Sequence, residues 1–264
     1  MPPELCVIRG GGDLATGIAW RLTRGGWPVV VCELSEPLTV RRTVAVSSAV
    51  REGSVEIEGM RAELASSVAD AQELARRGIV GVVVSPGLPD LGADVVVDAR
   101  VAKRNIDTSL DDAGAAGLVI GIGPGFTAGV DCHAVVETQR GHHLGRVLWD
   151  GTAAPDTGTP GLIAGKGAER VLRAPAGGTV AWNVAIGDLV TAGETLGSIE
   201  DDALTSPLDG LVRGLIAPGV EVTAGTKIGD IDPRCDPSAC LEISDKALSV
   251  GGGVVEAVLS WLNR

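Results

Sequence analysis

Apolar and polar positions alternate in blocks along the first half of the chain. Leu5 to Arg9 and Val29 to Glu33 are short apolar runs typical of buried strands, and apolar residues recur between them at helical spacing from Leu14 to Leu22. Three further strands are predicted at residues 80–84, 94–98 and 118–121. Strands that alternate with helices indicate a mostly parallel sheet covered by helices. We therefore expect a Rossmann-like α/β domain over residues 1–165.

The second half of the chain contains an internal repeat. Residues 178–200 align with residues 210–232 at an offset of 32, with ten identical pairs. The longest shared run is Val190-Thr191-Ala192-Gly193, which corresponds to Val222-Thr223-Ala224-Gly225. Each half has short strands separated by turn glycines and cannot bury an apolar face alone. The two halves are therefore expected to pack around a pseudo-twofold axis.

Residues 173–232 resemble the fold of biotinyl and lipoyl carrier domains. The resemblance rests on Gly187-Asp188-x-Val190-x-x-Gly193 in the first half and on Ser206-Pro207-x-x-Gly210 at the crossover. In carriers a lysine at the hairpin between the halves accepts the cofactor, whereas residues 199–205 contain no lysine. We expect a lipoyl-like barrel (a barrel-sandwich hybrid) that carries neither biotin nor lipoate and serves as a docking or lid module. Residues 233–264 are expected to form a C-terminal segment whose final helix, near Val254 to Leu262, packs on the first domain.

Composition and charge exclude several classes of partner. The formal net charge is −12, and no basic stripe is visible that would neutralise phosphates, so neither nucleic acid nor an anionic membrane surface is an expected partner. No apolar run is long enough for a membrane span, and the first residues lack the basic start of a signal peptide. Five cysteines at scattered positions do not indicate a disulfide framework. We expect a cytoplasmic protein with reduced thiols.

The glycine-rich turn after the first strand is a candidate cofactor-binding loop. Gly10-x-Gly12-x-x-Ala15 lies between a strand and a helix, where glycines allow a pyrophosphate to approach the backbone and the helix N-terminus attracts anions. Glu33 ends the next strand, where an acid would bind a ribose hydroxyl. The candidate residues here are Gly10, Gly11, Gly12, Asp13, Gly17 and Glu33. Asp13 would repel a phosphate unless it caps the helix, and a tight turn that only packs helix on sheet explains the glycines equally well.

Cationic residues and a second glycine-rich turn follow the later strands. These candidates are Arg100, Lys103, Arg104, Asn105, Gly123 and Gly125. Because the carboxyl ends of parallel strands share one edge of a sheet, they could form one cradle for an anionic ligand together with the first loop. The alternative is a solvated helix start that carries salt bridges. No Gly-Lys-Ser/Thr pattern follows either turn, so ATP hydrolysis is not supported.

Cys132 and His133 are the candidate catalytic residues. A thiolate at Cys132 could hold sulfur or selenium beside a cofactor, with help from His133 if the two side chains approach each other. Residues 133–138 alternate like a strand, and neighbours on a strand point to opposite faces, so this cooperation needs a bend. All three histidines lie within residues 133–143, but their spacing matches no zinc pattern, and we predict no metal site.

Several motifs together resemble the YqeB family over essentially the whole chain. They are Gly10-Gly11-Gly12-Asp13-Leu14-Ala15-Thr16-Gly17, Ala102-Lys103-Arg104-Asn105, Gly123-Pro124-Gly125-Phe126, Val136-Glu137-Thr138-x-Arg140-Gly141-His142 and Asp232-Pro233-Arg234. The family is named as an accessory of selenium-dependent molybdenum hydroxylases, relatives of xanthine dehydrogenase. The resemblance implies a role in maturing the molybdenum cofactor or its labile selenium, through contact with the cofactor, the apo-enzyme or other maturation proteins. It supplies no catalytic residues.

Two other functions stay open at this point. The first glycine loop and Glu33 suggest an NAD(P)-dependent oxidoreductase, although no Tyr/Lys or His/Asp set for hydride transfer is visible and the chain contains no tyrosine. A non-catalytic scaffold would use the barrel for docking and bind no small ligand. The expected ligand is accordingly molybdopterin or a nucleotide such as NAD(P).

Overall fold

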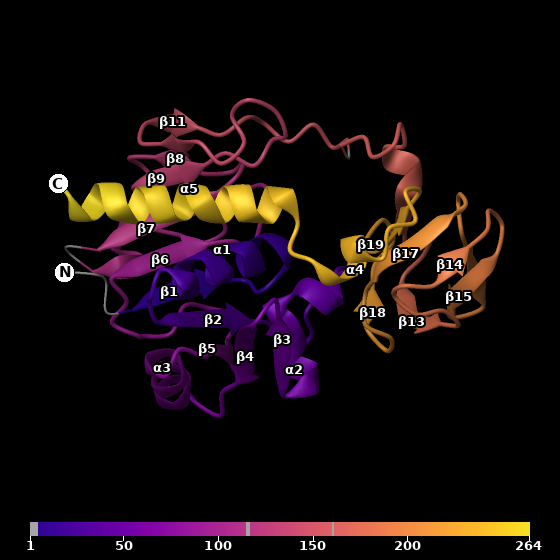
Figure 1. The fold of residues 1–264 in the computed structure, drawn as a ribbon, viewed down its shortest axis with the longest axis horizontal. Coiled ribbons are helices and arrows are strands. Elements are labelled where there is room, and N and C mark those ends of the chain that lie inside the picture. Colours follow the sequence, from indigo (N-terminus) through magenta and orange to yellow (C-terminus); the bar gives the residue numbers. More distant parts are fainter. Residues whose placement is uncertain (1–4, 115–116, 160) are drawn as a thin grey trace. The chain divides into compact units, whose positions relative to one another are not determined.

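A computed structural model describes residues 5–114, 117–159 and 161–264 (Figure 1). The chain forms two compact units, each assembled from segments that are distant in the sequence. The first unit comprises Met1–Pro37, Ala45–Thr157 and Ile243–Arg264, and the second comprises Leu38–Val44 and Gly158–Glu242. Among the described residues, none of the helices has the length and apolar character that a bilayer crossing requires.

The first unit is built on a nine-stranded sheet with the order β10-β9-β7-β6-β1-β2-β5-β4-β3. Its strands are β1 (Cys6–Arg9), β2 (Val29–Glu33), β3 (Ser54–Ile57), β4 (Met60–Leu64), β5 (Val80–Val84), β6 (Val95–Asp98), β7 (Leu118–Ile122), β9 (Ala134–Val136) and β10 (Val147–Leu148). Neighbours from β9 to β4 pair in parallel, and only β10 and β3 are antiparallel. The predicted mostly parallel sheet is therefore confirmed.

Helices cover the two faces of this sheet, which explains why its central strands are almost entirely apolar. The helices are α1 (Asp13–Arg24), α2 (Ala49–Glu52), α3 (Val68–Arg76) and α5 (Asp245–Leu262). One face packs on α1 and α5, and Val7 and Val30 on the other face pack against Ala71 and Leu74 of α3. Beside α3, that face is covered by the short helix η3 (Leu110–Ala113) and by a small sheet of β8 (Thr127–Ala128) and β11 (Gly151–Thr152).

Helix α5 is longer than its sequence predicts. It begins at Asp245 rather than near Val254, and the side chain of Ser244 caps it by accepting a hydrogen bond from the Ala247 amide. Three consecutive glycines, Gly251–Gly253, interrupt the apolar pattern and lower its intrinsic helix propensity. Close packing against α1 stabilises the helix instead, since Gly251 lies on the Gly17 carbonyl.

The second unit contains two four-stranded antiparallel sheets. The strands are β12 (Val171–Arg173), β13 (Gly178–Trp182), β14 (Leu189–Val190), β15 (Thr195–Ile199), β16 (Asp202–Thr205), β17 (Gly210–Leu215), β18 (Glu221–Val222) and β19 (Lys227–Asp232). Short segments before and after them are η1 (Arg42–Val44), η4 (Ala168–Arg170) and α4 (Ser238–Leu241). The sheet orders are β12-β19-β17-β14 and β16-β15-β13-β18. A shift of 32 residues carries β15 and β13 of the second sheet onto β19 and β17 of the first. The outer strands are exchanged between the sheets, because the same shift carries β12 and β14 of the first sheet onto β16 and β18 of the second.

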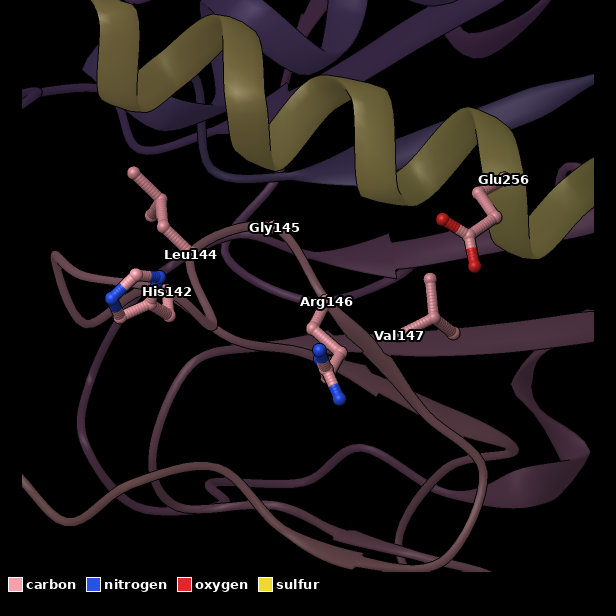
Figure 2. Close-up of a pocket in the computed structure, with 6 residues that line it drawn as sticks. All are labelled: His142, Leu144, Gly145, Arg146, Val147 and Glu256. Carbon is pink, nitrogen blue, oxygen red and sulfur yellow. The ribbon is translucent and has the colours of Figure 1, made fainter.

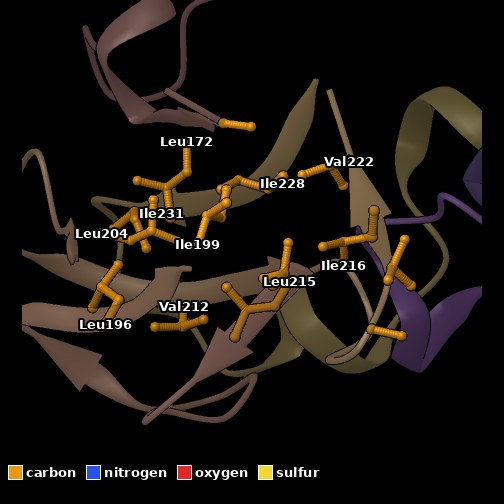
Figure 3. Close-up of a cluster of buried hydrophobic side chains, with 14 of the residues drawn as sticks. Leu172, Leu196, Ile199, Leu204, Val212, Leu215, Ile216, Val222, Ile228 and Ile231 are labelled. Carbon is orange, nitrogen blue, oxygen red and sulfur yellow. The ribbon is translucent and has the colours of Figure 1, made fainter. Parts of the chain in front are cut away.

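The predicted repeat thus appears in the topology and also in the core. Leu196 and Ile199 of the first half and their counterparts Ile228 and Ile231 of the second are almost fully buried in one cluster between the sheets (Figure 3). Each half contributes β14 or β18 to the sheet that the other half forms. Neither half could therefore complete its sheet or bury its apolar face alone.

Candidate functional site

Three strand-end loops meet at the carboxyl edge of the large sheet. Gly10 follows β1 and lies against Arg100, which follows the neighbouring strand β6; a Cβ at Gly10 would be 3.2 Å from the Arg100 Cα. Gly125 follows β7, and a Cβ there would be 2.5 Å from the Arg104 Cα. Since Gly125 has a φ of +108°, glycine is favoured there by both its conformation and the contact. The expected meeting of the first glycine loop with the cationic segment is thus observed.

A buried ionic network occupies the position where β1 and β6 end. Asp98, which is 1% exposed, accepts hydrogen bonds from Arg100 Nη2 at 2.5 Å and from Thr108 Oγ1 at 2.6 Å. Arg100 and Arg9 both donate to Asp107, at 2.6 Å and 2.7 Å. Partial burial opposes ionisation of Asp107, but these hydrogen bonds and charges outweigh it and lower its pKa. Arg100 therefore stabilises the loop through its ion pairs. The structural role of Asp98 was not predicted from the sequence.

The next cations along the loop are more accessible. Lys103 is exposed and forms an ion pair of 2.7 Å with Asp156. Arg104 is also exposed and makes no ion pair with the described part of the chain. Val101 and Lys103 have φ values of 52° and 63°, a strained conformation for residues other than glycine. Asn105 is anchored, because its amide donates to Asp131 at 2.9 Å and to the Thr108 carbonyl. Arg104 is the cation best placed to bind a ligand here.

The first glycine loop is more occupied than its sequence suggests. The Gly11 amide donates to Glu33 Oε2 at 2.7 Å, and the Gly11 carbonyl accepts from the Ser47 amide at 2.9 Å. Glu33 does end β2 as expected, but its carboxylate already holds backbone amides in this structure. Gly12 is the N-cap of α1 and provides no side-chain cap, and Asp13 places a negative charge in the first turn. The carboxylates of Glu33 and Asp13 therefore both lie at this loop, and their negative charges weaken its attraction for a phosphate.

Gly17 lies away from this loop, in the interface between two helices. It is buried in α1, and a side chain there would collide with the backbone of Ala247 in α5. The second turn is different, because Gly123 and Gly125 both lie at the carboxyl edge. Gly123 has a φ of +77° and lies against the Thr138 side chain, which follows β9. Helix packing accounts for Gly17, whereas the second turn borders the accessible cations.

Cys132 and His133 point to opposite faces of the sheet. Cys132 is buried in a cluster with Phe126 and Val135, and burial raises the pKa of its thiol to about 11. His133 packs on Trp261 of α5 with ring centroids 4.8 Å apart, and its Nδ1 accepts a hydrogen bond from the Val119 amide. Burial and the charge of Arg264 lower the His133 pKa. This environment favours a protonated thiol and a neutral imidazole, and it does not bring the two side chains together.

Beneath α5 lies an open depression lined by His142, Leu144, Gly145, Arg146, Val147 and Glu256 (Figure 2). None of these residues was a candidate, and the depression has no enclosed polar cluster.

Lys246, in the first turn of α5, is a partly buried cation that the sequence analysis missed because it placed the start of that helix too late. Within the described ranges, no group of three or more His, Cys, Asp or Glu residues is arranged to hold a metal ion.

Comparisons with known proteins support the expected resemblance. No protein-family model matches the chain. The chain is 46% identical over 264 residues to the protein YqeB of Escherichia coli strain K12, a match that covers 99% of this chain and 48% of YqeB. The resemblance to YqeB is therefore confirmed, and the chain spans about half the length of this curated relative.

Solved structures add no further information on the fold. A succinylglutamate desuccinylase/aspartoacylase from Rhodobacter sphaeroides is 16% identical, with 77% of this chain and 57% of that chain covered and a TM-score of 0.24. An aspartoacylase family protein from Mesorhizobium loti is 11% identical, with 88% and 85% covered and a TM-score of 0.27. Scores this low do not establish a common fold.

Proposed function

We propose that this relative of YqeB is an accessory protein in the maturation of a selenium-dependent molybdenum hydroxylase, and that it binds a phosphate-bearing cofactor at the carboxyl edge of its large sheet. The resemblance described above supplies the biological context. The observation that carries the binding proposal is the contact of the Gly123–Gly125 turn with Arg104, which is exposed and forms no ion pair with the residues that the structure describes. The proposed ligand is molybdopterin or a nucleotide.

The strand order supports a Rossmann-like ligand site. The six strands β5-β2-β1-β6-β7-β9 are parallel and follow the order 3-2-1-4-5-6 that is found in dinucleotide-binding sheets. In such sheets, ligands bind beyond the carboxyl ends of the strands, where the chain changes direction across the sheet. Here that position is the pair β1 and β6, which is followed by Gly10 and Arg100.

The ligand's phosphate would lie nearer the second glycine turn than the first. The Gly11 amide is held by Glu33, and Asp13 adds another negative charge at the first loop. Backbone amides at the second turn would hold the phosphate, and Arg104 would neutralise it with help from Lys103. A charge-assisted hydrogen bond of this kind contributes about 1.5–3 kcal/mol.

The second unit would act as a docking module for the apo-enzyme. Its exchanged strands and duplicated core support the lipoyl-like barrel that its sequence resembles. The hairpin between β15 and β16, where a carrier would have its lysine, instead contains the exposed acids Glu200 and Asp201. Neither biotin nor lipoate is therefore an expected modification.

One alternative has an observation in its favour. The strand order, together with Glu33 at the end of β2, is also typical of NAD(P)-dependent oxidoreductases. In that case the cofactor would be NAD or NADP, and a ribose hydroxyl would have to displace the Gly11 amide from the Glu33 carboxylate.

Calorimetry with molybdopterin, NAD and NADP tests the proposal. Arg104→Ala should weaken binding of the true ligand about tenfold or more, because about 1.4 kcal/mol corresponds to a factor of ten. Arg76→Ala is the matched control, since Arg76 is an exposed arginine at the end of α3 whose ion pair with Glu73 is exposed. Equal effects of the two substitutions would contradict the site. If the wild type binds none of the three ligands, the edge is structural and the chain acts as a non-catalytic scaffold.

A further inference from the structure

Two arginine side chains from neighbouring strand ends converge on one carboxylate oxygen. Arg9 Nη2 donates to Asp107 Oδ1 at 2.7 Å, and Arg100 Nη2 donates to the same oxygen at 2.6 Å. Arg9 ends β1, and Arg100 follows β6, the strand that pairs with β1. At this point of the sheet the chain changes direction, and sheets with this strand order bind their ligands there. Asp107 therefore places its carboxylate where the strand order predicts a ligand.

The two guanidinium groups are held in place by partners other than Asp107. The Arg9 side chain is 4% exposed, and its Nη1 donates to Thr108 Oγ1 at 3.2 Å. Arg100 is held by the buried carboxylate of Asp98, which accepts hydrogen bonds from both Nε and Nη2. An arginine that keeps its other partners is preorganised, so it loses little freedom when it binds an anion. The two Nη2 groups would therefore remain in position if the Asp107 carboxylate left.

Asp107 is the member of this network that a ligand can replace. Its side chain is 50% exposed, whereas that of Asp98 is 2% exposed. Both arginines share its Oδ1, and its Oδ2 forms no hydrogen bond or ion pair within the part of the chain that the structure describes. The next residue is anchored, because the Thr108 amide donates to Asn105 Oδ1 at 2.8 Å and Thr108 Oγ1 donates to Asp98 at 2.6 Å. A rotation of the Asp107 side chain can therefore release its carboxylate to water while the backbone stays in place.

The charge of the network determines which group could take this place. Asp98 pairs with Arg100, and Asp112 Oδ2 lies 3.5 Å from Arg9 Nη1, so these two acids balance the two arginines. Asp107 therefore adds one negative charge to a set that is otherwise neutral. A phosphate group offers oxygen acceptors to converging guanidinium donors, which arginine binds with matching geometry. A phosphate with a single negative charge, as in a diphosphate or a diester, can replace Asp107 without a change in total charge.

We infer that Arg9 and Arg100 form a second phosphate-binding position, which the Asp107 carboxylate occupies until a ligand displaces it. This position rests on the proposed function for the identity of its ligand, since that function places one phosphate at Arg104 on the same loop. The first glycine loop borders the position, because Gly10 lies against Arg100. Two positions suit a ligand with two linked phosphates, which favours a nucleotide diphosphate over a phosphate monoester. Asp107 then competes with the ligand and lowers its affinity.

Calorimetry with inorganic phosphate as the probe tests this competition. Wild type should bind phosphate, and Asp107→Ala should lower the dissociation constant about tenfold or more, because two charge-assisted hydrogen bonds no longer compete with the anion. Asp111→Ala is the matched control, since Asp111 is a nearby exposed acid whose side chain forms no hydrogen bond or ion pair with the described residues. Absence of binding to wild type, or an equal gain in both variants, would overturn the inference.

Two further measurements separate a binding role from a structural one. Arg100→Lys keeps a positive charge beside the buried Asp98 but loses the forked donors, so phosphate binding should weaken severalfold. Asp107→Ala should lower the urea midpoint in phosphate-free buffer, and phosphate should raise the midpoint of this variant more than that of wild type, because a ligand stabilises the state that it binds. If phosphate affinity is unchanged in Arg100→Lys, or phosphate leaves both midpoints unchanged, the network is structural and the inference is wrong.

Arg104→Ala, made in wild type and in Asp107→Ala, distinguishes this inference from the proposed function. The gain in phosphate affinity from Asp107→Ala should persist without Arg104, because Arg9 and Arg100 supply the contacts. If Arg104→Ala abolishes that gain, phosphate binds at Arg104 alone and only the inference fails. If the gain persists while Arg104→Ala has no effect on the binding of molybdopterin, NAD or NADP, the proposed site at Arg104 fails and the position between Arg9 and Arg100 stands.

Discussion

Adding a methyl group at Gly252 should stabilise the first unit, whereas adding one at its neighbour Gly251 should not. Both glycines lie inside α5. A Cβ at Gly251 would lie 2.5 Å from the Gly17 carbonyl oxygen and 2.9 Å from Arg21 Cγ, whereas a Cβ at Gly252 would have no neighbour within 4 Å. The two substitutions therefore share one effect, helix propensity, and differ in a second effect, the contact with α1.

The magnitudes follow from this comparison. Replacing glycine by alanine in a helix interior stabilises by about 1 kcal/mol. Overpacking a tight interface destabilises by about 1–3 kcal/mol. Gly252→Ala should therefore gain about 1 kcal/mol, whereas Gly251→Ala should range from no change to a loss of about 2 kcal/mol. Because propensity cancels, the difference between the variants isolates the packing of α5 on α1.

Urea unfolding, followed by tryptophan fluorescence, measures the difference. Trp20 in α1 and Trp261 in α5 lie in the two helices concerned. With an m-value of about 2 kcal/mol/M, the two midpoints should differ by about 0.5–1.5 M. A Gly251→Ala variant that is as stable as Gly252→Ala would refute the close packing of the helices.

Two further predictions concern thiol reactivity and acid stability. Cys235 is exposed and the other four cysteines are buried. Ellman's reagent should therefore react with one thiol in the native protein and with five in urea. Reaction of Cys132 in the native protein would contradict its burial. Burial opposes ionisation of Asp232, but hydrogen bonds from Arg234 and the charge of Arg213 outweigh it and lower its pKa. The carboxylate thus stabilises the second unit above the unfolded-state pKa of about 3.9, and this contribution is lost as pH falls through the folded-state pKa. Asp232→Asn should therefore lower the urea midpoint at neutral pH, and the gap to wild type should narrow as pH falls below about 4. A gap that stays constant or widens as pH falls contradicts the sign.

The elements that were predicted best from the sequence are the strands that are buried on both of their faces. Runs such as Val29–Val31 and Val95–Val97 are buried on both faces of a parallel sheet, so hydrophobicity alone located them. The duplicated unit was visible for a similar reason, because each half repeats the same glycines and buried aliphatic positions. The start of α5 was missed because tertiary contacts at Gly251 and Gly253, not local propensity, stabilise that part of the helix.

The candidate site was predicted at the level of loops but not of individual side chains. Strand order alone brings Gly10 to Arg100, so their meeting followed from the parallel sheet. The sequence did not show that Arg100 would be engaged in ion pairs with Asp98 and Asp107, so that a ligand could reach it only by displacing one of them. The strand-like pattern of residues 133–138 indicated correctly that the side chains of Cys132 and His133 would point apart. No local pattern reveals that burial lowers the pKa of Lys246, or that the charges of Asp13 and Glu137, which are distant in the sequence, act on it in the opposite direction.

The interleaving of segments has a consequence for how the protein is made. Arg42 of the second unit donates to the Leu215 carbonyl, and Arg41 donates to the Glu242 carbonyl, so these partners leave the ribosome long after residues 38–44. The first unit likewise needs α5 to pack on α1, and α5 is synthesised more than 200 residues after α1. At about 5–20 residues per second, translation takes roughly 10–45 seconds to bridge such separations. Neither unit can therefore complete its folding during synthesis of the first half, and exposed apolar strands must be kept from aggregating until the last helix emerges.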